Sequence, residues 1–263
     1  MIIKGNLNLP NCNKLESLGE LEEVEGDLDL SRNVDLISLG KLKKVSGDLF
    51  LYSNDKLQKL NLEIVKGELN IRFCKNLTSL KTLKYVGGNF LISGSNIREL
   101  SDELEVKGNF SLYTRYINKL PNNLKVGRSI DVSGMPIESL PNNLIHVKGE
   151  LNLSECVHLK TLNKLSYVQK ELNLVRTSIE SLPDDLKVGG DLSLHDCKNL
   201  RKLPNNLQVG GYLDLTKTNI SELPKNLKVI GSIYLSKDSK ITKKYISKNY
   251  GNYNKSNFIW LEA

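Results

Sequence analysis

Four cysteines and three histidines are the residues of this 263-residue chain that could bind a metal ion or act as nucleophile and base. Such chemistry needs several of these side chains to meet in a fixed geometry. The histidines lie at different phases of the chain, without a Cys, Ser or carboxylate at a spacing typical of catalytic or metal sites: His146, His158 and His195. Catalytic triads, phosphate-binding loops and zinc motifs are absent from the sequence. We therefore predict no enzyme, no metal site and no cofactor.

A repeat of 20 or 21 residues must position these side chains. The segment Val-x-Gly-x-Leu-x-Leu returns twelve times, with its first position at Ile3, Val24, Val45, Val65, Val86, Val106, Val126, Val147, Val168, Val188, Val209 and Val229. Only Arg128 and Lys170 replace the glycine. Apolar and polar residues alternate after it, as in Gly26-Asp27-Leu28-Asp29-Leu30, which predicts one short strand per repeat with one buried face.

One such repeat buries too little apolar surface to fold alone, so the coils must stack. We predict a mainly β, right-handed, single-domain solenoid of about 12 coils of 20–21 residues with a long parallel sheet, spanning residues 1–236. Prolines after the corner leucines exclude a long helix in the coils. Residues 237–263 form a C-terminal cap or tail, with a short helix over Ile241–Lys248 and Phe258–Leu261 folded over the last coil.

The stretch Leu28-Asp29-Leu30-Ser31-Arg32-Asn33-Val34-Asp35-Leu36-Ile37-Ser38-Leu39 resembles leucine-rich repeats. The Gly-x-Leu-x-Leu openings are similar to receptor L-domain repeats, and Leu-Pro-x-x-Leu is similar to the short repeats of bacterial effector proteins. The resemblance covers about residues 3–241, with one extra residue before each strand. It implies a protein-binding scaffold that contacts its partner with the exposed sheet face.

The cysteines share one position of this repeat, three residues after the second strand leucine: Cys12, Cys74, Cys156 and Cys197. Other repeats carry Asn33, Asn54, Thr177 or Thr218 there. In leucine-rich repeats this position points inward and satisfies backbone groups of the turn. We therefore expect structural thiols.

The outward sheet positions are acidic, although the chain carries a formal charge of +7. Neighbouring carboxylates would repel each other, a cost that a cationic partner would remove. The alternative is a hydrated surface that keeps the sheet soluble and unpaired. The candidate binding residues in these columns are Asp27, Asp48, Glu68, Glu150, Glu171, Asp191 and His195.

Repeats three to six also carry aromatic residues and arginines at outward or strand-exit positions, the residue types that dominate interface energetics. We predict a second set of partner-binding residues in Phe50, Tyr52, Arg72, Phe73, Leu91, Tyr113 and Arg115. Packing of some of these aromatics against the turns is the competing interpretation.

The sequence holds neither a membrane-spanning stretch nor a secretion signal, which predicts a cytoplasmic protein without a membrane partner. Lysines on the turn before each strand could follow phosphates, but they lack interleaved aromatics, so a nucleic-acid partner is less favoured. The uncapped N-terminal edge predicts a homodimer or strand addition by a partner.

These features predict a non-catalytic protein–protein interaction scaffold. The Asn, Lys and Ile content fits an AT-rich microbe or virus. Short Leu-Pro-x-x-Leu solenoids in such settings resemble host-interaction factors, and this resemblance implies a phage or bacterial factor that binds and inhibits a host or defence protein. Two alternatives stay open: a surface adhesin or glycan-binding solenoid, and a nucleic-acid binder that uses the turn lysines.

Overall fold

The computed structural model describes residues 1–249 and 257–262, and it is a mainly β, parallel β-solenoid of about twelve turns. The chain divides into two compact units, Met1–Asp131 and Val132–Ala263. The one helix among the described residues is α1, Lys243–Asn249. The predicted fold class is confirmed, and the predicted boundary at residue 236 stays a prediction.

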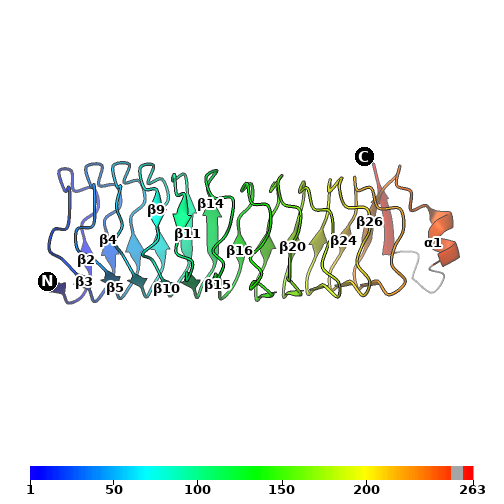
Figure 1. The fold of residues 1–263 in the computed structure, drawn as a ribbon, viewed down its shortest axis with the longest axis horizontal. Helices are drawn as coiled ribbons and strands as arrows, with labels where there is room; N and C mark the ends of the chain where they lie inside the picture. The colour runs from blue at the N-terminus through cyan, green and yellow to red at the C-terminus, as the bar shows by residue number, and fades with distance from the viewer. Residues whose placement is uncertain (250–256, 263) are drawn as a thin grey trace. The chain divides into compact units, whose positions relative to one another are not determined.

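Unit 1 holds two rows of parallel strands, drawn blue to green in Figure 1. The first row is formed by the recurring valines: β1 (Ile2–Ile3), β3 (Glu23–Val24), β5 (Lys44–Val45), β7 (Ile64–Val65), β10 (Tyr85–Val86), β13 (Glu105–Val106) and β15 (Lys125–Val126). The second row follows the glycines: β2 (Leu7–Asn8), β4 (Leu28–Asp29), β6 (Leu49–Phe50), β8 (Leu69–Asn70), β11 (Phe90–Ser93), β14 (Phe110–Tyr113) and β16 (Ile130–Asp131). A further pair joins β9 (Ser79–Leu80) to β12 (Glu99–Leu100).

Unit 2 repeats this arrangement. Its valine row is β17 (His146–Val147), β19 (Tyr167–Val168), β21 (Lys187–Val188), β23 (Gln208–Val209) and β25 (Lys228–Val229). Its second row is β18 (Leu151–Asn152), β20 (Leu172–Asn173), β22 (Leu192–Ser193), β24 (Leu213–Asp214), β26 (Ile233–Ser236) and β27 (Phe258–Leu261).

Each turn therefore contributes two short strands, and the prediction of one strand per repeat was wrong. The register pairs Val24 with Val45 in the first row and Leu28 with Leu49 in the second. The residues around the glycine separate the two strands of a turn. The valine of the first strand and the leucine of the second therefore both point into the core, from two different sides of the solenoid. Both rows bury their apolar side chains, at about 1.5–3 kcal/mol for each fully buried leucine or valine.

The glycine column is explained by the approach of successive turns. A Cβ atom added to Gly47 would overlap the carboxylate Oδ1 of Asp27 and lie 2.7 Å from the backbone nitrogen of Asp27. The backbone of Gly47 does not adopt a left-handed conformation. The glycine is thus needed for space and not for its φ angle.

The C-terminal segment folds over the last turn, as predicted. Strand β27 pairs in parallel with β26, and Trp260 donates from Nε1 to the carbonyl of Ile241 at 3.4 Å. Helix α1 begins after Thr242, whose Oγ1 accepts the backbone N–H of Tyr245 at 3.2 Å and so caps the helix. The predicted helix is confirmed with slightly shifted bounds, and residues 250–256 and 263 lie outside the described part of the chain.

Candidate partner-binding face

The acidic residues at the start of the second-row strands form a column that holds neighbouring turns together; we call it the strand-start column. In unit 1, Oδ1 of Asp27 accepts the backbone N–H of Asp48 at 2.8 Å, and Oδ1 of Asp48 accepts that of Glu68 at 2.7 Å. Farther along the same column, Asn89 uses its amide oxygen in the same way for the N–H of Asn109, at 3.0 Å. These carboxylates thus have a structural task that sequence reasoning missed.

Glutamates occupy this column differently, because their side chains are one methylene longer. Glu68 accepts from the side-chain amide of Asn89 at 3.1 Å, and Glu150 lies 3.6 Å from the ammonium of Lys170. Asp191 returns to the aspartate pattern and accepts the N–H of Tyr212 at 2.9 Å. Glu150 is exposed, whereas Glu68 and Glu171 are half-buried like the aspartates of the column.

The predicted repulsion between neighbouring carboxylates shows in unit 2. Burial raises the pKa of Glu171 above its ordinary value, and the charges of Asp191 and Glu150 raise it further. The charged form of Glu171 is therefore disfavoured in the folded protein.

At the other end of the strands, a short polar side chain turns the backbone out of the sheet. Oδ1 of Asp29 accepts the N–H of Ser31 at 2.8 Å, and Oδ1 of Asn70 accepts that of Arg72 at 3.3 Å. The residue after this turn takes a left-handed conformation in most repeats, as at Asn11, Arg32, Ser53, Phe73, Gly94, Gly134, Glu155, Arg176, Asp196 and Lys217. Side chains at this position project from the turn.

The predicted aromatic residues of unit 1 gather at this strand exit. Phe50 and Leu91 are half-buried in the sheet, on either side of Asn70. Beyond them, Tyr52 and Arg72 lie on adjacent turns, because Arg32 and Ser53 donate their backbone N–H groups to the carbonyls of Tyr52 and Arg72 at 2.9 Å. Tyr113, two turns beyond Arg72, is 60% exposed.

Phe73 stands out among these residues. Its φ angle is 58°, a conformation that a bulky side chain adopts at a cost, and its side chain is 51% exposed. The ring lies against the next turn at Gly94, where an added Cβ would come within 2.6 Å of the ring carbon Cδ1. Polar residues or glycine fill this position in the other repeats, so the fold alone does not require an aromatic ring here.

Arginines accompany the aromatic rings. The guanidinium of Arg32 lies 5.7 Å from the centre of the Tyr52 ring, and that of Arg98 lies 4.8 Å from the Tyr116 ring. Nε of Arg72 donates to Oδ1 of Asn70 at 3.2 Å. We call the following residues the strand-exit cluster: Arg32, Tyr52, Arg72, Phe73, Arg98, Tyr113, Arg115 and Tyr116.

Sequence reasoning missed Arg32, Arg98 and Tyr116, because they lie outside the alternating strand positions. The recurrence of the left-handed position every 20 or 21 residues is the signal that could have found Arg32.

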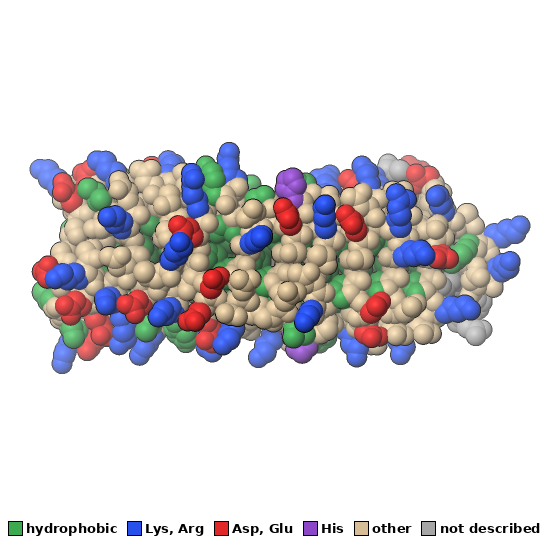
Figure 2. All heavy atoms as spheres, viewed as in Figure 1, with side chains coloured by type: hydrophobic (Ala, Val, Ile, Leu, Met, Phe, Trp, Pro, Cys, Tyr) green, Lys and Arg blue, Asp and Glu red, His purple; other side chains and the backbone are tan. Residues whose placement is uncertain are grey.

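Lysines and arginines of unit 1 differ in their partners. Several lysines bridge carboxylates of the preceding turn, as in Lys44 with Glu23 at 2.5 Å, Lys56 with Asp35 at 2.6 Å and Lys75 with Asp55 at 2.9 Å. Within residues 1–249 and 257–262, the arginines of the strand-exit cluster form no ion pair. The cluster is thus a cationic, aromatic surface without internal counter-charge. In Figure 2, lysine and arginine side chains project along the rims of the face in view.

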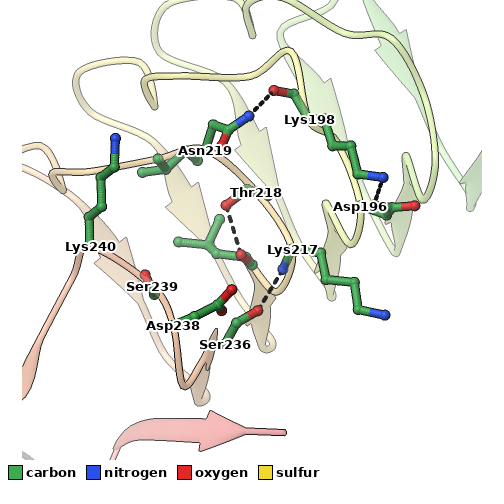
Figure 3. Close-up of a pocket in the computed structure, with 11 residues that line it drawn as sticks. Asp196, Lys198, Lys217, Thr218, Asn219, Ser236, Asp238, Ser239 and Lys240 are labelled. Atoms are coloured by element: carbon green, nitrogen blue, oxygen red, sulfur yellow. Dashed lines mark hydrogen bonds and ion pairs between the residues drawn. The ribbon is translucent and has the colours of Figure 1, made fainter. Parts of the chain in front are cut away.

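The strand exit of unit 2 is polar and ion-paired instead. Its turns surround an open hollow of about 450 Å³, where Lys198 pairs with Asp196 at 3.1 Å and Ser236 accepts the N–H of Lys217 at 2.7 Å (Figure 3). Nδ1 of His195 lies 2.6 Å from Oγ1 of Thr216, which donates to Asp214 at 2.6 Å. The predicted residues Glu150, Glu171, Asp191 and His195 belong to unit 2, and the predicted aromatic set belongs to unit 1.

Cys74, Cys156 and Cys197 are buried in the inward ladder, whereas Cys12 is half-buried. Sγ of Cys74 donates to the carbonyl of Leu51 at 3.0 Å, just as the amide of Asn54 donates to that of Leu30 at 3.0 Å. Burial raises the pKa of Cys74 to about 12. In the described part of the chain, His, Cys, Asp and Glu residues do not gather in threes at metal-binding distance, and the structure contains no helix long and apolar enough to cross a bilayer among those same residues.

Comparison with known proteins adds no assignment to this geometry, since no protein-family model matches the sequence and a search of curated proteins returned no significant match.

Proposed function

We infer that the chain is a non-catalytic protein-interaction scaffold that binds a partner protein through the strand-exit side of unit 1. The single observation that carries this proposal is the exposure of Phe73 in a costly left-handed conformation, two turns from the exposed Tyr113. Strained backbone concentrates at functional sites, and aromatic residues with arginine are enriched in the energetic centre of interfaces.

The resemblance to leucine-rich repeats supports the same function, since such solenoids present a regular surface to other proteins. A host or defence protein as the target, a phage or bacterial source and a cytoplasmic location remain parts of the proposal. Cell fractionation tests the location: recovery of the chain outside the cell would favour an adhesin or glycan binder.

Homodimerisation or strand addition at the free edge of β1 and β2 stays a separate proposal. Both strands end their rows in the described chain. Light scattering at high micromolar concentration tests the dimer, because a monomer at that concentration contradicts it.

Affinity capture with variants tests the main proposal. The double substitution Tyr52→Asp and Tyr113→Asp places two charges on the strand-exit cluster, whereas Tyr167→Asp changes an exposed tyrosine of unit 2 outside it. We expect one dominant protein to be recovered by the unaltered chain and by Tyr167→Asp, and to be lost with the double variant. Equal recovery with all three chains would contradict the proposal.

A further inference from the structure

The charges at the two ends of the second-row strands favour an acidic partner. The acidic sheet positions alone predicted a cationic partner instead. The aspartates of the strand-start column already accept backbone N–H groups of the next turn, at 2.7–2.8 Å in unit 1. Their negative charge is therefore partly satisfied inside the fold. The positive charges of the strand-exit arginines, by contrast, form no ion pair within the described residues.

Three of the four arginines of the cluster are also held in place. Arg32 and Arg98 lie over tyrosine rings at 5.7 and 4.8 Å, and Arg72 is anchored to Asn70. A guanidinium that stacks on a ring keeps its N–H edge available for a carboxylate, and its orientation costs little entropy on binding. Several lysines of the same unit, such as Lys56 and Lys75, are instead paired with carboxylates.

The turns that carry the arginines determine the distance between these side chains along the stack of turns. Arg32, Arg72 and Arg115 come from turns that are two apart, and stacked turns lie ~4.8 Å apart, so each step is about 10 Å. Extended peptide covers about 3.3 Å per residue, so about three residues of a bound segment separate successive arginines. Apolar side chains between the acidic ones would contact Phe73 and Tyr113.

We propose that the strand-exit cluster binds an extended acidic segment of a partner protein, with Asp or Glu at about every third residue and aromatic or aliphatic residues between them. This inference rests on the proposed function and adds the chemistry of the partner. Single-stranded nucleic acid is the competing polyanion, since it too could use arginine and stacked rings.

Titration calorimetry with synthetic probes tests the proposal. The probes are a twelve-residue peptide with Glu at every third position and Phe or Leu between, the same peptide with Lys in place of Glu, and a twelve-nucleotide oligothymidylate. We expect the acidic peptide to bind at least tenfold more tightly than either other probe. Tighter binding of the oligothymidylate, or equal binding of both peptides, would overturn the proposal.

Variants locate the binding. Arg72→Gln with Arg115→Gln should weaken binding of the acidic peptide at least tenfold, and Lys225→Gln with Lys228→Gln, which removes the same charge from exposed residues of unit 2, should change it less than twofold. Equal effects would contradict the proposal. A partner protein that is lost with Tyr52→Asp and Tyr113→Asp but still captured after both arginine substitutions would leave the proposed function standing and overturn the acidic segment alone.

Discussion

At the residue scale, the strand-start aspartates act as hydrogen-bond acceptors between turns. Asp48 accepts the backbone N–H of Glu68, and asparagine performs the same task at Asn89. Acceptor geometry is therefore what the fold requires at this position, and the negative charge is dispensable.

Replacement of Asp48 tests this role. We expect Asp48→Ala to lower the free energy of unfolding by about 1 kcal/mol, because the N–H of Glu68 loses its partner. Asp48→Asn keeps the acceptor and should change stability by only a few tenths of that value. Denaturant unfolding measures both, with Asp102→Ala as a control at an exposed aspartate. If Asp48→Asn destabilised as much as Asp48→Ala, the charge would matter and the account would be wrong.

Glu171 gives a pH-dependent prediction. Its raised pKa means that the folded state binds more protons than the unfolded chain, between the ordinary glutamate pKa and the raised value. The free energy of unfolding therefore falls as pH rises through that window, and Glu171→Gln removes the loss.

We expect Glu171→Gln to be more stable than the unaltered chain at pH 7, and the difference to vanish below the ordinary pKa of a glutamate. Thermal unfolding over a pH series measures it, with Glu180→Gln, an exposed position, as control. A stabilisation by Glu171→Gln that persists at low pH would exclude charge as its cause.

At the element scale, the glycine before a second-row strand packs closely against the aspartate of the preceding turn, as Gly47 does against Asp27. Gly47→Ala would push a methyl group into the carboxylate and backbone of Asp27, and we expect a loss of about 2 kcal/mol. Gly19→Ala meets no atom within 4 Å and carries only the strain of its φ of 56°, about 1 kcal/mol. Denaturant midpoints compare the two, and a larger effect at Gly19 would show that close packing is not the reason for the glycine column.

Sequence periodicity predicted the stacked coils because every repeat uses the same apolar positions. It missed the first row, the valine strands, since a two-residue strand such as Glu23–Val24 carries no alternation of its own. It found Phe73 and Tyr113 through their residue type. The partners of Asp27 and Arg32 lie on neighbouring turns, and only the register between turns reveals them.

At the scale of the whole molecule, the two units share a repeat and differ in their strand-exit turns. In unit 2, Arg176 pairs there with Glu155 at 2.8 Å, whereas the arginines of the strand-exit cluster in unit 1 lie among aromatic rings and form no ion pair among the described residues. A common scaffold thus carries a distinct surface on one unit, which is the basis of the proposed function.

Hydrogen–deuterium exchange of the chain alone and with its captured partner tests this account most directly. The account predicts that the partner slows exchange at the strand-exit turns of unit 1, within residues 50–54, 71–75, 91–95 and 112–117, while the strand-exit turns of unit 2 exchange as before. Protection confined to the strand-start turns or to unit 2 would contradict it.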